Sequence, residues 1–256
     1  MVAAEYPHVR YLRRSPVLPA LAHFRRVIEE SSAEFVVFFH DDDVLEPGYV
    51  DAMLLAMENN PDVAGLCCNA WVIQGEELTK RTVMGVFKRE RKMVSAEELL
   101  APYMTFMALG PAPFPGYMYR REFLSGIYLD AAHGGKYADV SFLMKVVERA
   151  PVLWIPKVLM RYRVHGANDG ITEAVGQRMS LLRYIYSHTK ITRHSGMVAE
   201  FRFRYWVRWW RGAMREGRYL ASGWRGRVVL RYLLIAGAKF ALLRPGLWLR
   251  LLMRVR

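Results

Sequence analysis

The chain has 256 residues, of which 53% are hydrophobic, and its formal net charge is +13. This length fits one large domain, or one domain with an appendage, and the hydrophobic content is sufficient for a sizeable buried core. The two cysteines, Cys67 and Cys68, are adjacent, which argues against a disulfide framework and favours a reducing, cytosolic setting. The opening after Met1 is polar and rich in arginine, so we expect no signal peptide.

The positive charge lies almost entirely at the C-terminal end. Residues 200–256 contain 14 Lys and Arg against two Asp and Glu, whereas residues 1–199 contain 23 basic and 22 acidic side chains. The sequence therefore predicts two parts, a neutral globular domain over 1–198 and a basic, helical tail over 199–256.

The first half of the domain alternates predicted helices and strands. Apolar spacing predicts a helix over 17–31, and the unbroken apolar run 35–39 predicts a strand buried on both faces, in the middle of an α/β sheet. A helix is expected over 47–58, with Pro47 in its first turn, and a second strand over 63–73. The expected inner face of that helix consists of Tyr49, Val50, Met53, Leu54 and Met57.

The middle of the domain is rich in loops. Residues 74–92 are polar and predict a loop or a loose hairpin. Residues 101–119 carry no charge, but four prolines and two glycines make a membrane span implausible, so we expect an ordered apolar loop that enters a short strand over 116–119. Residues 120–127 are expected to be helical, and a glycine-rich loop follows over 133–136.

The last elements of the domain surround two candidate functional residues. A helix is expected from Asp139, followed by two short strands over 152–155 and 158–164. Asp139 is either a helix N-cap or a catalytic carboxylate. His165, at the end of the second strand, is either incidental or a ligand for a metal or a phosphate.

Three consecutive aspartates, Asp41, Asp42 and Asp43, follow the run 35–39 and His40. Open α/β sheets bind ligands at the carboxyl ends of their strands. Carboxylates held together repel one another, and a hard cation such as Mg²⁺ or Mn²⁺ relieves that repulsion. The sequence therefore favours a cation site, with a solvated acidic turn before the next helix as the alternative.

Five stretches, in this order, resemble the family 2 glycosyltransferases of the GT-A fold, and together they cover about residues 5–170. They are a helix before the metal strand (ALAHFRRVIEES, 20–31), the metal strand itself (FVVFFHDDDVLEP, 35–47), the acceptor-side segment (PGYMYRREFL, 115–124), the helix of the catalytic base (ADVSFLMKV, 138–146) and a Tyr-Arg-x-His segment (VLMRYRVHGAN, 158–168).

The resemblance implies an α/β, GT-A-like (Rossmann-like) mixed sheet flanked by helices. It also implies metal-assisted, inverting transfer of a sugar from a nucleotide-diphosphate donor to a hydroxyl of a glycan or lipid-linked acceptor. The residue roles that it implies are Mg²⁺ or Mn²⁺ ligands (Asp42, Asp43, His165), donor diphosphate contacts (His40, Asp41), a catalytic base (Asp139) and acceptor-side residues (Gly116, Tyr117, Arg120).

The chain also departs from the family pattern. His40 stands where the metal motif commonly begins with Asp, and the acidic pair before the base is reduced to Ala138-Asp139. A Gln-x-x-Arg-Trp motif is absent, which argues against a polymerising synthase.

The first, nucleotide-binding strands of the family are missing, so the fold is expected to be truncated at the N-terminus. Either the chain is a fragment, or another element or partner replaces that half. A non-catalytic, glycosyltransferase-like partner protein is accordingly the alternative function.

In the tail, Arg204, Arg208 and Arg211 share a helical stripe with two further arginines, and Trp206, Trp209 and Trp210 fall on the opposite face. This pattern favours a helix lying in a membrane interface. The alternatives are that the tryptophan face packs on the domain, or that the tail binds nucleic acid, which the later Leu, Ile and Val residues disfavour.

Residues 228–243 are too short and too charged to indicate a span. We therefore expect a cytoplasmic enzyme, peripheral on the inner face of the membrane, without a nucleic-acid partner.

Overall fold

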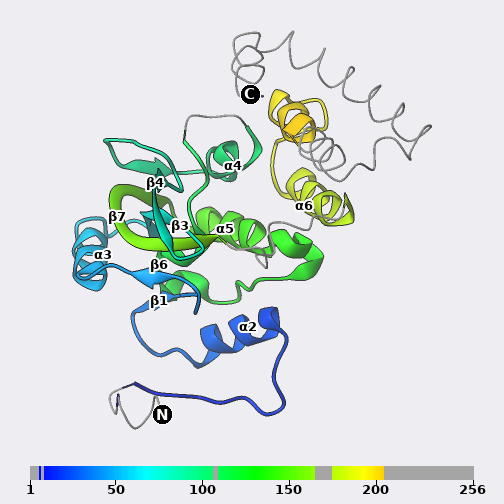
Figure 1. Cartoon of the computed structure of the whole chain (residues 1–256). Coiled ribbons are helices and arrows are strands. Elements are labelled where there is room, and N and C mark those ends of the chain that lie inside the picture. The colour runs from blue at the N-terminus through cyan, green and yellow to red at the C-terminus, as the bar shows by residue number, and fades with distance from the viewer. Residues whose placement is uncertain (1–5, 7–8, 106–108, 165–174, 205–256) are drawn as a thin grey trace, which may run out of the picture.

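The computed structural model describes residues 6, 9–105, 109–164 and 175–204 (Figure 1). His165 lies outside this range, as do the tail residues predicted to bind a membrane, apart from Arg204. The described chain is mixed α/β, with a curled mixed sheet flanked by helices, which confirms the general fold class expected from the sequence. Within these residues no helix is long and apolar enough to cross a membrane.

A single mixed sheet contains the seven described strands. Their order is β1-β6-β3-β7-β2, with β4 added on β3 and β5 added on β7. Only β3 and β7 run parallel to each other, and all other neighbours are antiparallel. The strands are β1 (Phe35–Val37), β2 (Val44–Leu45), β3 (Gly65–Gln74), β4 (Glu77–Thr82), β5 (Arg91–Met93), β6 (Tyr117–Arg120) and β7 (Val152–Val164).

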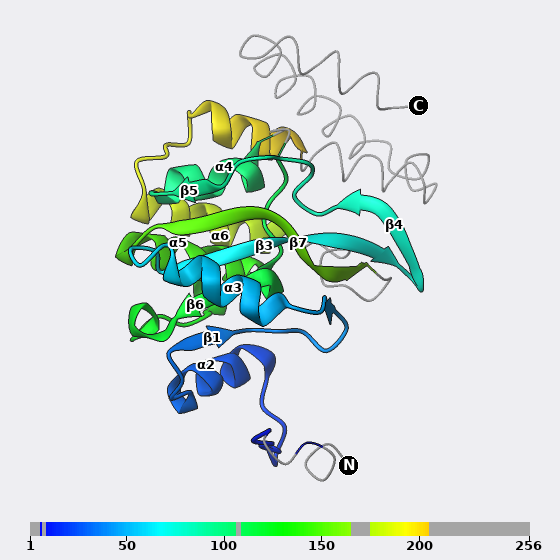
Figure 2. The same cartoon turned by 90° about the vertical axis from the view of Figure 1, so that its left-hand side faces the viewer.

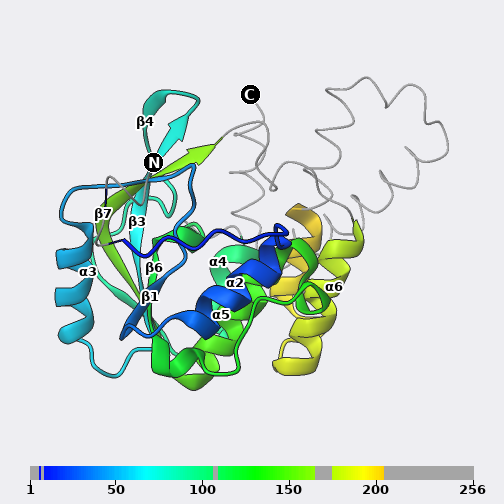
Figure 3. The same cartoon turned by 90° about the horizontal axis from the view of Figure 1, so that it is seen from below.

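Helices cover both faces of this sheet (Figures 2 and 3). The helix α3 packs on one face through Tyr49, Met53 and Met57, and the other helices lie on the opposite face around a larger apolar cluster. The α-helices are α2 (Ala20–Glu30), α3 (Tyr49–Glu58), α4 (Ala96–Met104), α5 (Ala138–Arg149) and α6 (Val175–His188). Short 3₁₀ helices occur at Phe114–Gly116, Arg121–Leu124, Ala131–His133 and Gly135–Tyr137.

The run 35–39 does not form a central strand, contrary to the prediction. The strand β1 is only three residues long and lies at one end of the sheet order. The last pair of its ladder with β6 is Val37 with Met118, one residue from the 3₁₀ turn that precedes β6. The ring of Phe38 instead enters the helix-side core, where it stacks on Phe114 with ring centroids 5.8 Å apart. The apolar run therefore reflects core packing beyond the strand as well as the strand itself.

The two strands predicted at 152–155 and 158–164 are one continuous strand, β7. Its pairing with β3 shifts register between Cys67 and Asn69, which face Trp154 and Val158, so β7 carries extra residues at this point. Such a bulge tolerates Pro156, which has no N–H to donate to a ladder. Pro156, which suggested a break between two strands, thus lies at an irregularity within the single strand β7.

Several helix boundaries also differ from expectation. The helix α2 is shorter than predicted, and α3 begins at Tyr49 after Gly48, whose φ of 79° is left-handed, so Pro47 lies before the first turn. Val50 is 53% exposed and does not belong to the inner face. The expected helix over 120–127 is reduced to the 3₁₀ turn Arg121–Leu124.

The middle segments contain more regular structure than predicted. Helix α4 takes up the first residues of the supposed loop 101–119, and its start is capped: Ser95 accepts a hydrogen bond from the N–H of Glu98, whose carboxylate accepts one from Val94. The segment 74–92, expected to be a loop or a loose hairpin, contains β4, which forms a hairpin with the preceding strand β3 and not within the segment itself.

The side chain of Asn69 in β3 fixes the segment that follows β4 by hydrogen bonds. It is 2% exposed, donates to the carbonyl of Gly85 at 2.9 Å, and accepts from the N–H groups of Ala70 at 2.9 Å and Met84 at 3.1 Å. These groups would otherwise be buried without partners, which costs free energy comparable to a lost hydrogen bond for each of them.

We predict that Asn69→Ala lowers the free energy of unfolding by about 2–4 kcal/mol, because it leaves buried backbone groups unsatisfied. Urea denaturation followed by circular dichroism measures this change. The matched control is Asn60→Ala, which removes one partly buried hydrogen bond to the carbonyl of Ala56 and should cost about 1 kcal/mol or less. Equal effects of the two substitutions would contradict the proposed role of Asn69.

Candidate functional site

The aspartate loop is held at both ends by the sheet. It leaves β1 and enters β2, where Val44 pairs with Arg161 and Leu45 pairs with Met160 of β7. Just beyond β2, the N–H of Glu46 donates to the carbonyl of Leu159 at 2.9 Å. The position of the loop therefore depends on a strand more than 100 residues further along the chain.

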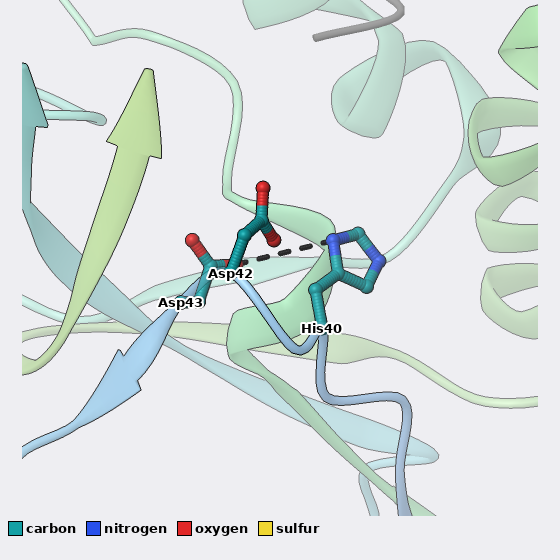
Figure 4. Close-up of side chains that lie close together, drawn as sticks. All are labelled: His40, Asp42 and Asp43. Atoms are coloured by element: carbon teal, nitrogen blue, oxygen red, sulfur yellow. Dashed lines mark ion pairs between the residues drawn. The ribbon is translucent and has the colours of Figure 1, made fainter. Parts of the chain in front are cut away.

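His40, Asp42 and Asp43 come together in this loop, and Figure 4 shows the His40 ring beside the carboxylates. One potential ligand atom from each lies within 4.8 Å of the others. His40 was expected at the donor diphosphate, but its Nδ1 atom lies 3.9 Å from Oδ2 of Asp43 and belongs to this cluster. Asp41 is exposed and is not part of the cluster.

Asp43 is the buried member of the cluster. Its side chain is 1% exposed, and its Oδ1 atom accepts a hydrogen bond from the N–H of Arg163 at 2.8 Å. Its Oδ2 atom is buried and has no hydrogen-bond partner among the described residues. Burial raises the pKa of Asp43, and the charge of Asp42 adds to this effect, while the Arg163 N–H and His40 oppose it.

Aromatic rings support His40 from the helix side. The centroid of its imidazole lies 6.4 Å from that of Phe24 in α2 and 6.2 Å from that of Phe114. These two rings also contact Phe38, the last residue before the loop turns outward. The imidazole is thus held on an aromatic layer that belongs to the core.

Asp139 lies in the first turn of α5, but it is not the N-cap, a position that Tyr137 occupies. Asp139 is half-buried, and burial raises its pKa to about 6, although its own N–H and that of Val140 oppose the rise. A carboxylate in the first turn gains from the helix dipole. The raised pKa means that desolvation outweighs this gain. Raised pKa values of this kind are common among groups that exchange protons near neutral pH.

Tyr162 of β7 connects the acidic loop with Asp139 electrostatically. Burial raises the pKa of Tyr162, and the charges of Asp43, Asp42 and Asp139 raise it further. The charges of the cluster and of Asp139 thus both disfavour ionisation of Tyr162, although these groups lie about 100 residues apart in the sequence.

The residues expected on the acceptor side have structural partners. Gly116 and Tyr117 are buried, and the Tyr117 hydroxyl accepts a hydrogen bond from Nε1 of Trp154 at 2.7 Å. Arg120 donates to the carbonyl of Met57 at 2.8 Å and pairs with Glu34 at 3.4 Å. The acceptor-side role of these residues rests on the family resemblance alone.

The comparisons with known proteins leave the family open. No protein-family model matches the chain. A search of the curated proteins finds no significant match either. The case for a function therefore rests on the geometry of the site and on the motifs of the sequence.

The raised pKa of Asp139 predicts a specific dependence of stability on pH. The folded state binds the Asp139 proton more tightly than the unfolded state does. Protonated Asp139 therefore contributes favourably to the free energy of unfolding at low pH, and this contribution is lost as the pH rises from about 4 to about 6. The stability of the wild type relative to Asp139→Asn should fall by about 1–2 kcal/mol over that window, the half-exposed position reducing the effect.

Urea unfolding at a series of pH values measures this difference. The matched control is Asp51→Asn, an exposed aspartate in the first turn of α3, for which no such fall is expected. A constant difference between wild type and Asp139→Asn from pH 4 to 7 would show that the Asp139 proton is not held more tightly in the folded protein.

Proposed function

We propose that this chain is a metal-assisted, inverting glycosyltransferase that uses a nucleotide-diphosphate sugar and a hydroxyl acceptor, glycan or lipid-linked. The observation that carries the proposal is the Oδ2 atom of Asp43, which is buried beside Asp42 and His40 and has no hydrogen-bond partner among the described residues. A buried carboxylate oxygen that accepts no hydrogen bond is costly, and the His40 ring 3.9 Å away relieves this cost only when it is protonated. Two carboxylates and an imidazole suit Mn²⁺ or Mg²⁺, the imidazole favouring Mn²⁺.

The cluster supplies the ligands for such a cation. Asp42 and Asp43 would hold it through carboxylate oxygens and His40 through Nδ1, with Arg163 fixing the second oxygen of Asp43. A bound divalent cation would stabilise the negative charge that develops on the departing diphosphate. His165 remains a predicted further ligand outside the described residues.

Asp139 is suited to remove the proton from the acceptor hydroxyl. With a pKa of about 6 it is mostly ionised at pH 7, yet it is a stronger base than an ordinary aspartate. The charges of Asp139, Asp42 and Asp43 all act on Tyr162, which supports a common site for the base and the cation ligands. The GT-A arrangement likewise combines metal ligands with a carboxylate base.

The proposal predicts that wild type releases a nucleoside diphosphate from one of a panel of nucleotide sugars when Mn²⁺ and acceptor are present. Asp139→Asn should lower this rate by about 10²–10⁴-fold, the usual contribution of a general base, and leave Mn²⁺ affinity unchanged. Asp43→Asn should lower both the turnover rate and the Mn²⁺ affinity, because it removes a proposed ligand. Even changes to residues that only surround a metal weaken its binding by about 10–100-fold. Coupled diphosphate detection and Mn²⁺ electron paramagnetic resonance give the two readouts.

Asp51→Asn is the control for both measurements and should resemble wild type. Turnover by Asp139→Asn at the wild-type rate would contradict its role as the base. Mn²⁺ binding without turnover on any donor would instead favour the non-catalytic partner protein, and the absence of Mn²⁺ binding would refute the cation site.

The basic tail is proposed to bring the enzyme to the inner face of the membrane. The structure describes only its first residues: 196–204 are helical, Phe201 and Phe203 are buried, and Arg204 donates to the carbonyls of Tyr103 and Thr105. The start of the predicted tail therefore belongs to the domain, and Arg204 binds it directly. A deletion that tests the tail should begin at residue 205.

Deleting residues 205–256 is expected to abolish co-sedimentation with vesicles of anionic phospholipid, since 12 of the tail's cationic side chains are removed. The control is neutral phosphatidylcholine vesicles, to which the intact chain should bind more weakly. Unchanged sedimentation of the shortened chain with anionic vesicles would refute the membrane role.

A further inference from the structure

Arg163, near the end of β7, contacts the aspartate loop with both its backbone and its side chain. Its N–H holds Oδ1 of Asp43, and its Nε atom donates to the carbonyl of Asp42 at 2.8 Å. Two adjacent residues of the candidate cation site are thus hydrogen-bonded to a single arginine that belongs to another strand.

The same guanidinium also reaches the tip of the β3–β4 hairpin. Its Nη1 atom donates to the carbonyl of Gly75 at 2.7 Å and lies 3.6 Å from the carboxylate of Glu76. Gly75 has a φ of 64°, the left-handed conformation of this turn. Arg163 therefore links three segments, namely β7, the aspartate loop and the hairpin tip, which are otherwise distant in the sequence.

This geometry requires a guanidinium. Its donors are fixed in a plane and point in different directions, so one side chain can serve the Asp42 and Gly75 carbonyls together. A lysine ammonium keeps the charge but places all its donors on one atom at the end of a flexible chain. The ion pair with Glu76 contributes little to the stability of this contact, because the Glu76 side chain is 97% exposed to solvent.

We propose that Arg163 is a positioning residue for the cation site: its guanidinium fixes the Asp42 backbone against the hairpin tip, so that the Asp42 and Asp43 carboxylates are held in a binding geometry. This inference rests on the proposed cation site. It adds that the β3–β4 hairpin, which carries none of the ligands, supports that site through the carbonyl of Gly75.

The sign of the effect separates positioning from simple electrostatics. The backbone N–H that donates to Asp43 is retained in glutamine and lysine variants, so these changes at Arg163 test the side chain alone. Removing a positive charge near a cation site should strengthen Mn²⁺ binding if charge alone mattered. Positioning predicts the opposite, a weaker affinity, and it predicts a loss even for lysine, which retains the charge.

The experiment measures Mn²⁺ binding by electron paramagnetic resonance in the full chain and in Arg163→Gln and Arg163→Lys. Both variants should bind Mn²⁺ about 10–100-fold more weakly, as expected for groups that orient metal ligands. The matched control is Arg161→Gln, in the same strand two residues away, which pairs with Glu46 and should leave the affinity unchanged. Thermal unfolding without metal shows whether each variant is folded.

A third variant tests the far anchor should both arginine variants fail to fold. Gly75→Ala adds a methyl group with no atom within 4 Å but strains the left-handed turn, so it shifts the carbonyl that Arg163 binds. It should weaken Mn²⁺ binding in the same direction, by a smaller factor. Wild-type affinity in all folded variants, or tighter binding by Arg163→Gln, would overturn the role of Arg163 and leave the cation site standing. No binding by wild type would overturn both.

Discussion

Strand β7 is the element on which both the sheet and the candidate site depend. It runs parallel to β3, pairs with β5 near its beginning and pairs with β2 near its end. Because β2 is only two residues long, it has little stability of its own and takes its position from β7. The aspartate loop, which ends at β2, is therefore placed by a long-range backbone pairing rather than by its own sequence.

This dependence explains how carboxylates come to be held in an unfavourable setting. Desolvation of Asp43 opposes its ionisation, and Asp42 lies beside it. An isolated loop would relieve such strain by turning Asp43 into water. The pairing of β2 with β7, together with the N–H of Arg163, prevents that movement. The free energy that holds the carboxylates in place comes from the remainder of the sheet and its core.

The sequence predicted local features well and long-range ones poorly. The apolar periodicity located α2, α3, α5 and β3 to within a few residues, because helix and strand spacing is a local property. The cap of α4 is a local signal as well, since Ser95 is followed three residues later by Glu98, and it could have indicated this helix. The edge position of β1 could not be inferred, since it depends on a pairing with β6, far along the chain.

The candidate site shows the same division. The aspartates after an apolar run were sufficient to single out this loop as a candidate cation site, and the spacing of His40, Asp42 and Asp43 could have indicated that the imidazole lies with the carboxylates. Arg163 could not be found in this way, since its contacts with Asp42 and Gly75 depend on pairings across 121 and 88 residues. Nor could the sequence distinguish a capping role for Asp139 from a buried, high-pKa carboxylate.

The two carboxylates assigned roles in the proposed mechanism differ in their surroundings. Asp43 is buried, with an N–H donor at one oxygen and an imidazole 3.9 Å from the other. Asp139 is half-buried, and desolvation raises its pKa to about 6. These surroundings suit the proposed cation ligand, which must stay ionised, and the proposed base, which must exchange its proton near neutral pH. A cation bound at the cluster would therefore favour ionised Asp43 most strongly and act on Asp139 only from a distance, lowering its pKa slightly. In the proposed mechanism, Asp43 would thus hold charge tightly while Asp139 remains able to gain and lose a proton.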